Sequence, residues 1–104
     1  MKILARNFLC PAGEADIIAL DRSTRREIGA ETIVVVEVKT RSSDRYVSPA
    51  AAVDSHKQKR LEKIANHYLT LKNAAEQYAL RFDIVSIVIR DGEKPVVEHI
   101  VDAF

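Results

Sequence analysis

Cysteine occurs only once in the 104-residue sequence, at position 10, so no disulfide can form within the chain. A lone cysteine is typical of proteins from reducing compartments, and we therefore expect a cytoplasmic protein. No apolar run approaches the ~20 residues that a membrane-spanning helix needs, and no signal peptide precedes the first predicted strand. The three glycines form no phosphate-binding loop. These absences exclude membrane proteins, secreted proteins and disulfide scaffolds.

The sequence also lacks a large excess of either charge, because 16 basic residues face 15 acidic ones. The charges are nevertheless unevenly distributed. Between Lys39 and Lys63 there are seven basic and three acidic residues, a net charge of +4, which leaves −3 for the remainder of the chain. Such a basic segment is either a solvated helix face or a contact surface for a polyanion such as nucleic acid.

The pattern of apolar residues predicts one domain, residues 1–104, with five strands. A chain of this length buries roughly two-thirds of its unfolded surface, which suffices for an ordinary core. The strands are expected at 3–9, 14–21, 32–39, 81–90 and 95–101, with a hairpin connection at 22–31 and a polar loop at 40–53. The segment 32–39 is almost entirely β-branched and apolar, which predicts a central strand that is buried on both faces.

One amphipathic helix is predicted after the polar loop. It begins near Asp54 or Ser55, and apolar residues then recur at steps of three and four, at Leu61, Ile64, Ala65, Tyr68 and Leu69. The order of elements predicts an α/β fold with a mixed central sheet of about five strands. The main helix lies between the third and fourth strands.

Two charged residues continue an apolar strand face, which is the first sign of a site. Side chains alternate along a strand, so Glu37 and Lys39 follow Ile33 and Val35 on one face. Ionised groups beside a core are costly unless they are paired or bind a metal. The two residues are therefore either an ion pair at a frayed strand end or part of a functional site.

Asp16, on the preceding strand, favours the functional site. If the second and third strands form a hairpin, Asp16 and Glu37 meet on one sheet face. Two such carboxylates would repel unless a hard cation lay between them, and Mg²⁺ or Mn²⁺ suits oxygen ligands together with substrate phosphate. Lys39 could then act on a water nucleophile or on the developing charge of a phosphate. This pattern predicts metal-assisted hydrolysis of phosphodiester bonds.

The start of the predicted helix supplies further candidates. Gln58 lies one turn before Leu61 and could point at the site, or it could complete a capping box with Ser55 as the N-cap. Lys57, Lys59 and Arg60 lie in or beside the first turn, where free backbone N–H groups also favour phosphate.

Three other side chains are candidates for binding or structural roles. Arg41 follows the predicted central strand and adds to the nucleic-acid-binding candidates. Tyr46 is either a base-stacking residue or an ordinary surface side chain. Asp83 shares a strand face with Val85 and Ile87, and we expect it to have a structural partner such as an arginine.

Several longer segments carry a family resemblance. They are ILARNF at 3–8, CPAGEADIIAL at 10–20, VVVEVKTR at 34–41, KQKRL at 57–61 and RFDIV at 81–85. The second and third segments resemble the PD-(D/E)xK nuclease superfamily, especially archaeal Holliday-junction resolvases. Taken together, the five segments most closely resemble the YraN-like family of uncharacterised bacterial proteins.

The resemblance implies a restriction-endonuclease-like core and assigns roles to individual residues. Asp16 and Glu37 would be metal ligands, with the Val38 carbonyl as a further ligand. Lys39 would assist the attacking water, and Gln58 would match a polar residue on the following helix. Relatives usually carry a helix before the first strand, which this sequence lacks. The apolar surface that this helix covers would then be hidden in another way, for instance in a homodimer.

The sequence therefore predicts a Mg²⁺- or Mn²⁺-dependent endonuclease that hydrolyses phosphodiester bonds in DNA, either branched or single-stranded. The alternative is a catalytically weak nucleic-acid-binding or protein-interaction module on the same scaffold.

Overall fold

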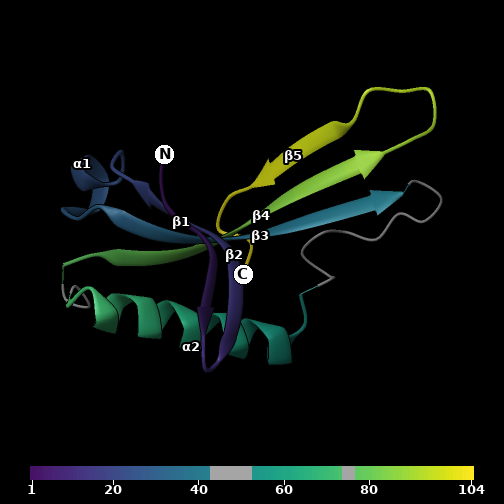
Figure 1. Cartoon of the computed structure of the whole chain (residues 1–104). Helices are drawn as coiled ribbons and strands as arrows, with labels where there is room; N and C mark the ends of the chain where they lie inside the picture. Colours follow the sequence, from purple (N-terminus) through teal and green to yellow (C-terminus); the bar gives the residue numbers. More distant parts are fainter. Residues whose placement is uncertain (43–52, 74–76) are drawn as a thin grey trace.

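The computed structural model describes residues 1–42, 53–73 and 77–104. Its elements are β1 (Lys2–Cys10), β2 (Gly13–Asp21), α1 (Arg25–Ile28), β3 (Thr32–Ser42), α2 (Ser55–Leu71), β4 (Ala79–Ile89) and β5 (Val96–Ile100), as Figure 1 shows. The predicted fold class is confirmed, with a main helix between the third and fourth strands. Tyr46 lies outside the described residues. No helix in the described ranges is long and apolar enough to cross a membrane.

The five strands form one sheet in the order β1-β2-β3-β4-β5. All neighbouring pairs are antiparallel except β3 and β4, which run parallel because α2 carries the chain back between them. The central position of β3 was expected from its continuous apolar run. Its residues from Thr32 to Val36 are buried, as a strand covered on both faces requires.

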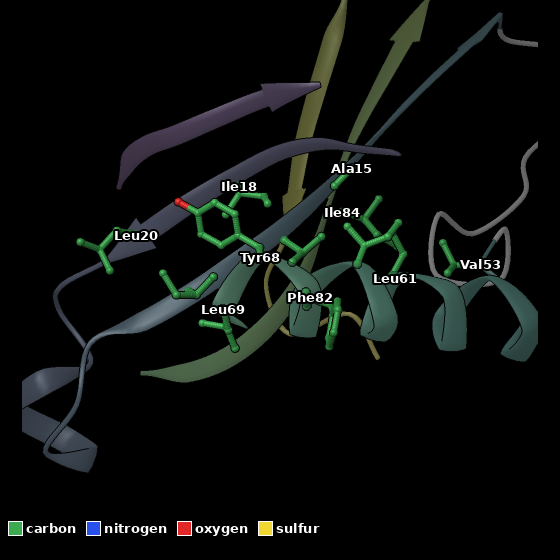
Figure 2. Packing of buried hydrophobic residues seen from close by; sticks show 13 residues of the cluster. Ala15, Ile18, Leu20, Val53, Leu61, Tyr68, Leu69, Phe82 and Ile84 are labelled. Carbon is green, nitrogen blue, oxygen red and sulfur yellow. The ribbon is translucent and has the colours of Figure 1, made fainter. Parts of the chain in front are cut away.

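The main core lies between α2 and one face of the sheet (Figure 2). Strand alternation directs Ile33 and Val35 into this core, whereas Val34 and Val36 join a smaller cluster that also contains Ala19. The predicted helical stripe is confirmed, since the buried residues of α2 are Leu61, Ile64, Ala65, Tyr68 and Leu69. Burial of one such aliphatic side chain contributes roughly 1.5–3 kcal/mol, so the stripe fixes α2 on the sheet.

The hairpin of β1 and β2 separates from the rest of the sheet near its tip. Pairing of β2 with β3 ends at Ile17 and Val36, whereas pairing with β1 continues to Cys10 and Gly13. Figure 1 shows β3 and β4 continuing together beyond the point where the hairpin turns toward α2. At Gly13 the φ angle is +138°, and an added Cβ would lie 3.4 Å from Arg60 Cδ of α2. This is an ordinary van der Waals distance, so glycine is needed here for the positive φ of the hairpin tip rather than for space beside α2.

A buried carboxylate on the opposite face ties the C-terminal strand to the sheet. Asp83 is fully buried, and Arg81 donates to it from Nε (2.8 Å) and from the Nη2 nitrogen (3.0 Å). His99 Nε2 lies 2.8 Å from the carboxylate, and the Asp102 N–H donates at 3.0 Å. Burial raises the pKa of Asp83, but these hydrogen bonds outweigh it and lower the pKa below its ordinary value. The arginine partner expected from the sequence is confirmed.

Two connections differ from the expected ones. Residues 22–31 contain the short helix α1, which ends at Gly29 in the left-handed conformation (φ +75°). Strand β3 continues to Ser42 rather than ending at Lys39, because Thr40, Arg41 and Ser42 pair with Ile87, Val88 and Ile89 of β4. The apolar partner strand thus extends the ladder into a polar segment whose own composition favours a loop.

Candidate active site

Asp16 lies at the point where the pairing of β2 with β3 ends. The last pair of that ladder is Ile17 with Val36, so Asp16 and Glu37 are the next residue on each strand. The N–H of Val38 donates to Asp16 Oδ2 at 2.8 Å, and the carboxylate thereby replaces the main-chain acceptor that β2 no longer offers. Within the described ranges, Oδ1 of Asp16 receives no hydrogen bond. The Asp16 side chain is thus oriented against the segment that carries Glu37 and Lys39.

Glu37 binds two ammonium groups through one oxygen. Its side chain is 12% exposed, and Oε1 lies 2.8 Å from Lys57 Nζ and 3.2 Å from Lys39 Nζ. Lys39 lies on the same strand face, whereas Lys57 reaches across from the first turn of α2. The ion-pair interpretation of Glu37 and Lys39 is therefore correct, but the pair is not at a frayed end and contains a second cation.

The two ammonium groups compete for this carboxylate. The pKa of Lys39 is lowered, first by its contact with Lys57 and then by burial, against the opposing effect of Glu37. For Lys57, burial is the largest single effect and lowers the pKa, but the contacts with Glu37 and Lys39 together outweigh burial, and the pKa is raised. When the pH rises, Lys39 is the first of the two to lose its proton.

The start of α2 corrects one expectation about Gln58. The N-cap of α2 is Asp54, whose Oδ1 accepts a hydrogen bond from the Lys57 N–H at 2.8 Å. The predicted capping box with Ser55 as N-cap is therefore wrong, because Lys57 rather than Gln58 occupies the third helical position. The Gln58 amide instead donates to the Val53 carbonyl at 3.0 Å. A catalytic role for Gln58 stays a prediction.

The predicted basic residues separate into two groups. Lys57 forms an ion pair with Glu37, whereas Lys59 and Arg60 are exposed on α2 and do not contact Glu37. Arg41 lies two residues beyond Lys39 on β3 and pairs with Val88. The contact between Lys57 and Glu37 was missed from the sequence. Lys57 stands four residues before Leu61, so the spacing that defines the buried stripe already places it on the sheet side of the helix.

The donor set fits a hard divalent cation better than a closed metal site. Among residues 1–42, 53–73 and 77–104, no three His, Cys, Asp or Glu side chains are grouped as a metal cluster. The two carboxylates, Asp16 and Glu37, match Mg²⁺ or Mn²⁺, which takes one or two protein carboxylates and completes its shell with water and phosphate. A zinc site would need three or four protein ligands in tetrahedral geometry, usually with His or Cys among them. The Val38 carbonyl stays a predicted further ligand.

Comparisons with known proteins give a consistent result. Residues 1–87 match the model of a family described as uncharacterised protein family UPF0102. A UPF0102 protein of Geobacter metallireducens is 45% identical over 99% of this chain and 76% of its own length. UPF0102 proteins of Caldanaerobacter subterraneus and Nocardia farcinica are 42% and 38% identical, over 79% and 75% of their lengths. These names state no activity.

Proposed function

The chain belongs to the uncharacterised protein family UPF0102, and we propose that it is a metal-dependent endonuclease that hydrolyses phosphodiester bonds in DNA. One observation carries the proposal: the Asp16 carboxylate is held by the Val38 N–H, directly beside Glu37 and Lys39 on the central strand. This Asp, Glu and Lys pattern resembles that of the PD-(D/E)xK nucleases.

The residues of the site divide the expected chemistry among them. Asp16 and Glu37 would hold Mg²⁺ or Mn²⁺, which when bound would polarise the scissile phosphate and the attacking water. Lys39 donates a hydrogen bond that orients the water or neutralises charge developing on the phosphate. Lys59 and Arg60 on α2 contact flanking backbone phosphates and position the strand without reading its sequence. Branched and single-stranded DNA are the proposed substrates.

Metal-dependent cleavage tests the proposal directly. Purified protein is incubated with branched, nicked and single-stranded DNA in Mg²⁺ or Mn²⁺, and the products are resolved on a gel. We expect cleavage by the wild type, at least about 100-fold less by Asp16→Asn and Glu37→Gln, and wild-type activity in the control Glu62→Gln, which alters an exposed acid of α2. Undiminished cleavage by the two site variants would refute the assignment.

The second candidate is a DNA-binding module with little catalytic power. The observation that favours it is the pair of ammonium groups on Glu37 Oε1, which neutralises a metal-ligand candidate. This module would bind DNA without metal-dependent cleavage. If about four basic side chains contact phosphates, log K falls against log[salt] with a slope of about −3.6. An absence of salt-dependent binding would instead indicate a protein-interaction domain.

A further inference from the structure

We propose that Lys57 is a displaceable counter-ion of the metal site. Its ammonium occupies Glu37 in the metal-free protein, leaves when a divalent cation binds, and then becomes available to substrate phosphate. The inference rests on the proposed metal site and adds a residue to it, because it links metal loading to exposure of a phosphate-binding cation.

The geometry distinguishes Lys57 from Lys39. Both ammonium groups contact the same oxygen, Glu37 Oε1, and Lys57 is the nearer at 2.8 Å against 3.2 Å. Lys39 lies on β3 two residues from Glu37, so its main chain stays close to Glu37 whatever binds there. Lys57 comes from another element, and its contact depends on a flexible four-carbon side chain.

The backbone of Lys57 stays fixed while its side chain can turn. The Lys57 N–H is bound by the N-cap carboxylate of Asp54, so loss of the Glu37 contact does not unwind the helix start. The Lys57 side chain is 22% exposed, which leaves it a path to solvent. The main chain of Lys57 is therefore fixed in the helix, whereas its ammonium group can move.

The charge balance indicates why the cation must move. The two carboxylates Asp16 and Glu37 and the two ammonium groups of Lys39 and Lys57, both of which contact Glu37, together carry no net charge. A divalent cation that bound without displacing either ammonium would face two like charges within a few ångströms. Repulsion of this kind is only partly screened in a half-buried site. Release of Lys57 restores attraction and exposes an ammonium beside the position of the substrate.

Titration with Mn²⁺ alone, followed by calorimetry, tests the inference without any assay of activity. Lys57→Met keeps a long, unbranched side chain and removes its charge. We expect it to bind Mn²⁺ about tenfold more tightly than the wild type, since a partly buried ion pair no longer has to be broken. Lys63→Met, at an exposed lysine of the same helix, should bind as the wild type does. Asp16→Asn should lose the site.

The outcomes separate the two hypotheses. Binding that depends on Asp16 but is no tighter in Lys57→Met overturns the role of Lys57 and leaves the metal site intact. Binding that is unaffected by Asp16→Asn, or absent from both the wild type and Lys57→Met, overturns the metal site and this inference with it. If Lys57 serves only to bridge α2 and β3, Lys57→Met lowers the melting temperature and leaves Mn²⁺ affinity unchanged, which also overturns the inference.

A second measurement uses the unaltered protein and does not depend on the folding of a variant. Limited acetylation followed by mass spectrometry reports how accessible each lysine is. We expect acetylation of Lys57 to rise at least about threefold on addition of Mn²⁺, as its contact with Glu37 is broken, while Lys59 stays constant. An unchanged rate at Lys57 under saturating Mn²⁺ would overturn the proposal.

Discussion

Replacement of Arg81 by methionine should destabilise the protein more than replacement of the whole charged pair. Asp83 has no exposed surface, and Arg81 supplies two of the hydrogen bonds that hold its carboxylate. Arg81→Met keeps a long apolar side chain but leaves a buried carboxylate with His99 and the Asp102 N–H as its remaining partners. The perturbation therefore removes a counter-charge from a site that water does not reach.

The structure sets the magnitude of the effect. Removal of one partner from a buried ion pair costs about 3–5 kcal/mol, because the remaining charge is uncompensated. A small domain has a free energy of unfolding of only about 5–15 kcal/mol, so this loss is a large share of it. In the double variant Arg81→Met with Asp83→Leu, the isolated charge is gone and we expect about 1–4 kcal/mol to be recovered. Asp21→Asn, which removes the other carboxylate partner of Arg81 and weakens the acceptor for Ser23, leaves no charge isolated in the core and should cost less than Arg81→Met.

Urea unfolding at 25 °C, followed by circular dichroism, measures these differences. The pH dependence gives an independent check. In the wild type the pKa of Asp83 is lowered, so its stabilising contribution is present above the ordinary value of 3.8 and is lost as the pH falls through the lower folded-state pKa. In Arg81→Met, burial raises this pKa, and the deficit should shrink as the pH falls toward it. A double variant less stable than Arg81→Met, or a loss below about 1 kcal/mol in the single variant, would refute the reasoning.

Three further predictions concern local structure and can be checked by unfolding or by NMR. Gly13→Ala should cost about 1–3 kcal/mol in urea unfolding, since residues with a Cβ rarely adopt a φ of +138°; a neutral result would contradict the strain. Asp54→Ala should cost about 1 kcal/mol because the N-cap of α2 is lost. Ser55→Ala should be nearly neutral, and a larger loss of stability in Ser55→Ala than in Asp54→Ala would indicate that Ser55 is the cap. Hydrogen bonds from Ser23 and then Arg81 lower the pKa of Asp21 to about 2. The contribution of Asp21 to stability should therefore be present above the ordinary value of 3.8 and disappear as the pH falls through about 2. Titration of the Asp21 carboxyl near 3.8 by NMR would contradict this.

Elements with a strong local pattern could be predicted from the sequence, and those set by distant partners could not. The β-branched run of β3 and the apolar stripe of α2 appear in the structure because each segment buries a single, periodic face. The extension of β3 to Ser42 was missed because its cause is the partner strand β4. Helix α1 was missed because four residues carry too little periodicity to be recognised.

The candidate site was predictable in its members but only partly in its contacts. Asp16 and Glu37 could be brought together from the expected hairpin, since antiparallel strands fix which residues face each other. The hydrogen bond from the Val38 N–H depends on where β2 leaves β3, and no local signal marks that point. The choice between Asp54 and Ser55 as N-cap was equally hidden, because both residue types cap helices well.

The parallel pairing of β3 with β4 has a consequence for how the chain is made. During synthesis β1, β2 and β3 emerge first and can form an antiparallel meander, whereas Thr32 of β3 must wait for Ala79 of β4 to leave the ribosome. Until then the most apolar strand of the protein is an unprotected edge, open to pairing with another chain. A nascent chain arrested within α2 should therefore aggregate or recruit chaperones. Once β4 has left the ribosome, it can pair with β3 and cover this edge.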